Sequence, residues 1–188
     1  MLKIKENGIP NTVFELTIGQ FDKINTITAD VNLDEIEKWI EKFVYLGADR
    51  DDFDDMELEE FNQLIQEWNN QPHNPTERIA TIELDGYTYE AKESIGVKDL
   101  GMIEKVWKQQ TGEGSAETLA IIFKRTDLTK KEHYAPAHIK HKMKLFKEQP
   151  SNILIPYITE VFNKLMVVTK ELRDEATTEL EGSTDLPV

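Results

Sequence analysis

The stretch that decides the fold class is residues 79–90, which read Ile79-Ala80-Thr81-Ile82-Glu83-Leu84-Asp85-Gly86-Tyr87-Thr88-Tyr89-Glu90. Two short runs rich in β-branched and aromatic residues flank an Asp-Gly pair, which is the strongest local signal for a hairpin turn. On both sides of this stretch, apolar residues recur at the spacing of amphipathic helices. The sequence therefore predicts an α+β protein that is predominantly α-helical, with two helical segments separated by a β-hairpin.

Three helices are expected before the hairpin. Thr17 and Gln20 have the spacing of a capping box, which predicts a helix to about Thr28. Asn32 and Glu35 have the same spacing and predict the start of the second helix. The second and third helices each carry an apolar stripe, formed by Ile36, Ile40, Phe43 and Val44 and by Leu58, Phe61, Leu64, Ile65 and Trp68.

A linker is expected just before the hairpin. Residues 69–75 contain two prolines and three asparagines, which favour turns. We therefore divide the chain into a helical N-terminal segment (1–70), a linker (71–76), a hairpin with further helices (77–176) and a mobile acidic tail (177–188).

The second segment is expected to be helical after the hairpin. Thr129 and Glu132 form another capping box, and Pro136 suits the first turn of a helix whose Ile139, Met143 and Phe146 face inward. The other expected elements are a helix at 97–111, a short apolar segment at 119–123 and a last helix at 155–176.

The formal net charge of −14 argues against nucleic acid as the main partner, because phosphate contacts need Lys and Arg. The charge is unevenly spread, however. The candidate interaction patches are an acidic one, Asp49, Asp51, Asp52, Asp54, Asp55 and Glu57, and a basic one, Lys130, Lys131, Lys140, Lys144 and Lys147. Such patches can steer two copies or two partners into one orientation, and ordinary solvated faces are the alternative.

No pattern for chemistry stands out. The absence of cysteine excludes disulfides and thiolate sites. The acidic run fails as a calcium loop, because Phe53 would stand at position 5 and Asp54 where glycine is required. His133, His138 and His141 could approach one another, but no acidic residue completes a metal-binding motif with them. We expect no metal and no cofactor.

Motifs of catalysis and of membrane insertion are also missing. The chain has no G-x-S-x-G or S-x-x-K nucleophile motif and no phosphate-binding glycine loop, so we expect a protein that is not an enzyme. The first residues contain no apolar stretch long enough for a signal peptide, so none is expected, and the most apolar stretch of the chain, 153–168, is interrupted by polar residues. We expect no membrane association.

Two segments resemble proteins encoded among the virion genes of tailed bacteriophages. Residues 14–24 read FELTIGQFDKI and precede Lys38-Trp39 and residues 43–47, FVYLG. In the second half, residues 84–89 (LDGYTY) precede residues 119–125 (LAIIFKR) and a basic helix that reaches Phe146. The resemblance covers residues 14–168 and consists of helix caps and core positions.

The similar phage proteins include tail assembly chaperones and, in crAss-like phages, particle components or packaged cargo. The resemblance thus implies a particle or particle-assembly protein that acts through protein–protein contacts: a tail or head–tail component, a cargo protein or an assembly chaperone. Its partners would be other phage structural proteins or copies of itself. It would be made in the host cytoplasm and enter the virion. The alternatives are an acidic host-interaction protein, as a DNA mimic or inhibitor, and a metal-dependent enzyme that uses His133, His138 and His141.

Overall fold

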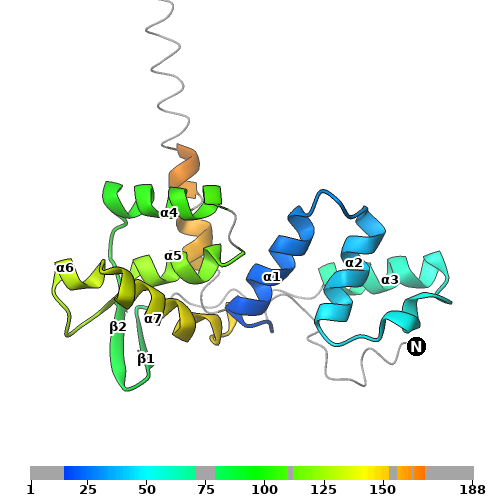
Figure 1. The fold of residues 1–188 in the computed structure, drawn as a ribbon, viewed down its shortest axis with the longest axis horizontal. Helices are drawn as coiled ribbons and strands as arrows, with labels where there is room; N and C mark the ends of the chain where they lie inside the picture. Colours follow the sequence, from blue (N-terminus) through cyan, green and yellow to red (C-terminus); the bar gives the residue numbers. More distant parts are fainter. Residues whose placement is uncertain (1–14, 71–78, 110–111, 153–155, 162, 168–188) are drawn as a thin grey trace, which may run out of the picture.

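A computed structural model describes residues 15–70, 79–109, 112–152, 156–161 and 163–167. Helices precede and follow one small antiparallel sheet (Figure 1), so the prediction of a mainly helical α+β protein is confirmed. The predicted linker 71–76 and tail 177–188 lie outside the described residues. None of the helices in the described part of the chain combines the length and apolar character that a bilayer crossing requires.

The first helix begins as its capping box predicts. In α1 (Ile18–Ala29), the Thr17 hydroxyl accepts the Gln20 N–H at 3.2 Å, and the Gln20 side chain accepts the Thr17 N–H at 2.9 Å. The predicted cap of α2 (Glu35–Tyr45) at Asn32 is wrong by two residues. Asp34 is the N-cap, because its carboxylate accepts the Glu37 N–H at 2.8 Å.

A smaller hydrophobic core joins α2 to the 3₁₀-helix η2 (Arg50–Phe53) and to α3 (Leu58–Asn69). Its centre is Phe43, whose ring lies 5.9 Å from Trp39 and 5.8 Å from Trp68 between centroids. Phe43 is buried, as predicted. Ile36 and Leu58 are exposed instead, because each lies in the first turn of its helix, outside this small core.

The hairpin is confirmed, and the sheet gains a strand that was not predicted. β1 (Thr81–Leu84) and β2 (Tyr87–Ala91) are antiparallel, and Asp85 and Gly86 join them with φ of 52° and 75°. Positive φ at both positions is the mark of a type I′ turn. β3 (Phe123–Arg125) then pairs with β2, giving the order β1-β2-β3. Three residues directly after a helix are too few to show a strand period.

Four helices accompany the sheet: α4 (Val97–Gln109), α5 (Gly114–Ile122), α6 (Lys130–His133) and α7 (Pro136–Lys147). The Thr129 capping box is present, and Pro136 stands in the first turn of α7. Ile139 and Phe146 are buried and Met143 packs against the same core, as the helical spacing predicts. Residues 156–161 and 163–167 of the expected last helix are helical.

The larger core surrounds α5. Seven of its nine residues are buried, and the helix contacts α1, α4 and α7. α1 contributes Ile18 to this core and also contacts α2, so it joins the larger core to the smaller one (Figure 1). A helix buried in this way has backbone groups at both ends that water cannot reach, and these groups must find partners within the fold.

Candidate functional site

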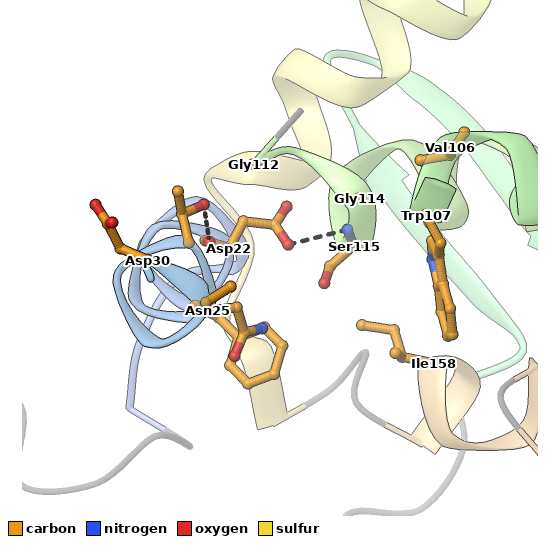
Figure 2. A pocket seen from close by; sticks show the side chains of 12 residues that line it. Asp22, Asn25, Asp30, Val106, Trp107, Gly112, Gly114, Ser115 and Ile158 are labelled. Carbon is orange, nitrogen blue, oxygen red and sulfur yellow. Dashed lines mark hydrogen bonds between the residues drawn. The ribbon is translucent and has the colours of Figure 1, made fainter. Parts of the chain in front are cut away.

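The N-terminal end of α5 is capped by a carboxylate from α1. Asp22 accepts the N–H of Ser115 at 2.9 Å (Figure 2) and the N–H of Ala116 at 3.1 Å. Burial raises the pKa of Asp22, while the hydrogen bonds from these residues act in the opposite direction. A negative group at this end is also favoured by the helix dipole. Asp22 therefore serves the fold, and it fills the position at which a helix N-terminus would otherwise bind an anion.

The C-terminal end of α5 is capped by a lysine from α7. The Lys142 ammonium donates to the carbonyl oxygen of Ala120, to that of Phe123 at 3.0 Å, and to Nδ1 of His133 at 2.9 Å. Nε2 of His133 in turn donates to the carbonyl oxygen of Ile121 at 3.1 Å. The three N–H groups of the Lys142 ammonium thus each have an acceptor, so its hydrogen-bonding capacity is filled although it is buried.

This arrangement lowers the pKa values of both Lys142 and His133. Burial, together with the charge of Lys92, lowers the pKa of Lys142 to about 7. Burial, together with the charge of Lys142, lowers the pKa of His133 to about 4, so the imidazole is neutral at neutral pH. Lys142 lies on a lysine-rich helix, three residues after Ile139 and four before Phe146, and the structure places it with them in the core with 2% of its surface exposed.

A second polar cluster lies where α4 begins. Lys92 binds the Asp99 carboxylate at 2.6 Å, and the Tyr134 hydroxyl donates to the same carboxylate at 2.6 Å. Burial by itself raises the pKa of Asp99, but the hydrogen bonds from Lys92 and Tyr134 outweigh it and lower the pKa. The cluster ties α4 to the end of α6.

Four of the five lysines in the predicted basic patch are exposed. Lys130, Lys131, Lys140 and Lys144 are exposed on α6 and on the outward side of α7, and we call these four residues the basic face. Lys147 does not belong to it, because it is half-buried and paired with Glu113. Sequence spacing alone could not show this pair, since its partners lie 34 positions apart.

The acidic patch gathers around η2, at the far end of the molecule. Asp49 caps η2 by accepting the Asp51 N–H at 3.2 Å, and Arg50 is paired with Glu37 and Glu41. All members of the predicted patch are exposed except Asp52, which is half-buried: Asp49, Asp51, Asp52, Asp54, Asp55 and Glu57. We call them the acidic face. In Figure 1, α3 beside this face and α6 lie at opposite ends of the long axis.

A groove that the sequence did not reveal lies between α1 and the corner joining α4 to α5, with a volume of about 540 Å³. α1 supplies one wall, from Phe21 to Asp30. The other wall contains Val106 and Trp107 of α4, residues near the start of α5, and Ile158 (Figure 2). Because its walls come from segments far apart in the chain, no local pattern predicts it.

The three histidines do not form a metal site. Both ring nitrogens of His133 are in hydrogen bonds, so neither has a lone pair available for a metal. His138 and His141 are half-buried on α7, and Nε2 of His141 lies 3.7 Å from the Asp85 carboxylate. Among the residues that the structure describes, no three His, Cys, Asp or Glu side chains are grouped to hold an ion.

By its fold, the chain is a mainly helical α+β protein built around one buried helix with a charged side chain at each end. Comparisons with models of protein families, with curated proteins and with solved structures gave no match.

Proposed function

We propose that the protein is a particle or particle-assembly protein of a tailed bacteriophage and that it acts by binding other polypeptides. The observation that carries the proposal is the separation of charge. Residues 30–70 contain 14 Asp or Glu and three Lys or Arg, a formal net charge of −11, whereas residues 105–147 contain ten Lys or Arg and four Asp or Glu, a net charge of +6. The acidic face lies beside α3 at one end of the molecule (Figure 1). Of the basic face, α6 with Lys130 and Lys131 lies at the opposite end, and α7 with Lys140 and Lys144 lies between them.

Separated charges of this kind suit protein partners. Complementary faces raise the rate of encounter and fix the orientation of docking. A net charge of −14 disfavours a nucleic acid as the main partner. The expected partners are therefore other phage structural proteins or further copies of this chain, and the expected location is the virion. The phage assignment is supported by the resemblance of residues 14–168 described above.

Cross-linking in purified particles tests the proposal. A carbodiimide joins a lysine to a carboxylate that it contacts, and the peptides are then identified by mass spectrometry. We expect Lys140 or Lys144 to be linked to a carboxylate of another polypeptide. The internal pair Lys147–Glu113 is the control, because these side chains are already in contact. Absence of the chain from particles and from assembly intermediates would contradict the proposal.

The exposed acidic face supports a second candidate, an acidic inhibitor of a host protein. The two candidates depend on different faces. Neutralising Asp51, Asp54 and Asp55 should abolish host binding by an inhibitor, whereas neutralising Lys140 and Lys144 should leave it intact. A particle protein should require the lysines.

A further inference from the structure

We infer that the groove between α1 and the α4–α5 corner binds the apolar side of a Lys- or Arg-rich amphipathic helix of a partner protein. The inference rests on the proposed function and states the chemistry of one partner segment. Three features of the groove carry it: apolar residues on both walls, short exposed side chains on the α1 wall, and no positive charge among the lining residues that the structure describes.

The groove has apolar surface and a suitable size. Phe21 of the α1 wall and Val106, Trp107 and Ile158 of the opposite wall supply the apolar surface. The indole N–H of Trp107 points away into the protein, where it donates to the Thr118 hydroxyl at 3.0 Å, so the ring offers apolar surface to the groove. About 540 Å³ is within the range of roughly 300–1,000 Å³ typical of binding pockets, and it can hold one or two large apolar side chains.

The wall that α1 provides is open. Asn25, Thr26 and Ala29 line the groove and are exposed. Together with Phe21 they follow the three- and four-residue spacing of one helix face, which extends for about 12 Å along α1. Short side chains let another helix approach closely, and apolar anchors spaced one turn apart are how helices bind in grooves.

The groove is electronegative. Its described lining residues include no Lys, Arg or His, and the carboxylate available at its rim is Asp30, because that of Asp22 is hydrogen-bonded to the start of α5. α1 also ends at this rim with no basic residue in its last turn, so the negative end of its dipole is not neutralised by its own side chains. On α4, the cation next to Trp107 is Lys108, and Glu104 pairs with it at 2.6 Å.

The residues next to the groove are also apolar or acidic. Val31 directly follows the rim and is 91% exposed, which makes it an apolar contact beside the groove. The chain then enters residues 30–70, with a formal net charge of −11. A partner helix with apolar residues on one side and Lys or Arg on its flanks matches both properties, whereas an acidic helix would be repelled.

A pair of synthetic helices tests the inference. One is a fluorescein-labelled 14-residue peptide of leucine and lysine, with leucine at amphipathic spacing, and the other has glutamate in place of every lysine. Binding is followed by fluorescence anisotropy with the full chain. Asn25→Phe fills the groove from an exposed position of α1, and Thr28→Phe is the matched control, since Thr28 is exposed on the same helix but does not line the groove. Thermal unfolding verifies that both variants fold.

We expect the leucine–lysine peptide to bind, Asn25→Phe to weaken its binding by about tenfold, and Thr28→Phe to leave it within about twofold. The leucine–glutamate peptide should bind at least about tenfold more weakly. Equal binding to the two variants, or no binding of the leucine–lysine peptide, would overturn the inference. A negative result with the peptides would not change the expected cross-links of Lys140 and Lys144 in particles. Each of the two proposals can therefore be refuted without the other.

Discussion

Asp22 and Lys142 cap opposite ends of the same buried helix. The carboxylate from α1 accepts two N–H groups at the start of α5, and the ammonium from α7 donates to the carbonyl oxygens of Ala120 and Phe123 at its end. Each charge has the sign that the helix dipole favours at its position. Two distant helices are thereby fastened to α5, and the core can bury seven of its nine residues without leaving these backbone groups unsatisfied.

Asp22→Asn should destabilise the protein by about 2 kcal/mol, because an amide can accept only one of the two N–H groups and places its own N–H₂ against the other. Urea unfolding measures the change. Asp54→Asn is the control, since this exposed carboxylate should change the free energy of unfolding by less than about 0.5 kcal/mol. Equal effects of the two substitutions would refute the capping role.

Lys142→Met should cost about 3 kcal/mol, because it leaves the Ala120 and Phe123 carbonyls and Nδ1 of His133 without their donor inside the core. Lys140→Met makes the same substitution on the exposed side of the same helix and should be nearly neutral. The comparison uses the midpoint of chemical unfolding. If Lys142→Met has only a small effect, the free energy lost by burying the ammonium equals the stabilisation that its hydrogen bonds provide.

Burial of His133 should make the protein less stable as the pH falls below neutrality. Its pKa is lowered from 6.5 to about 4, so between these values the unfolded chain binds a proton that the folded chain does not. The contribution of His133 is therefore complete above pH 6.5 and is lost as the pH falls to 4, amounting to about 3 kcal/mol. Between pH 7 and 4.5, the wild type should lose more stability than His133→Gln. Parallel curves would contradict this account, because the other titrating groups are common to both proteins.

Two glycine substitutions should have opposite signs. Gly86 has φ of 75° in the hairpin turn, so Gly86→Ala should destabilise by about 1 kcal/mol although the added methyl group meets no atom within 4 Å. Gly101 lies within α4 and is equally open, so Gly101→Ala should stabilise by about 0.5–1 kcal/mol. Thermal unfolding distinguishes them, and a stabilising Gly86→Ala would exclude the type I′ turn.

The sequence predicted those features that depend on neighbouring residues. The capping boxes at Thr17 and Thr129, the Asp85–Gly86 turn and the start of α7 at Pro136 each require only a few consecutive positions, and all are present. The acidic face and most of the basic face also follow from composition, because exposed charge is the default on helix surfaces.

The features that the sequence did not predict depend on contacts between residues far apart in the chain. Asp22 and Ser115 are 93 residues apart, and Lys142 and Ala120 are 22 apart, so no local pattern identifies the partners of these two charges. The groove has the same origin, since α1, α4 and residue 158 meet only in the folded chain. β3 was missed because its three residues extend a strand pair formed by the hairpin, which lies 32 residues or more away.

The central claim is that the basic face binds another polypeptide during particle assembly, and incorporation into particles measures it most directly. The copies per particle are counted by quantitative mass spectrometry for Lys140→Glu/Lys144→Glu and for Lys105→Glu/Lys108→Glu, an equal charge change on exposed residues of α4. Circular dichroism first verifies that both variants fold. We predict that the α7 variant is incorporated about tenfold less than the wild type, since reversed charges in an interface cost at least about 1.4 kcal/mol, while the α4 variant is incorporated normally. Wild-type incorporation of the α7 variant would contradict the claim.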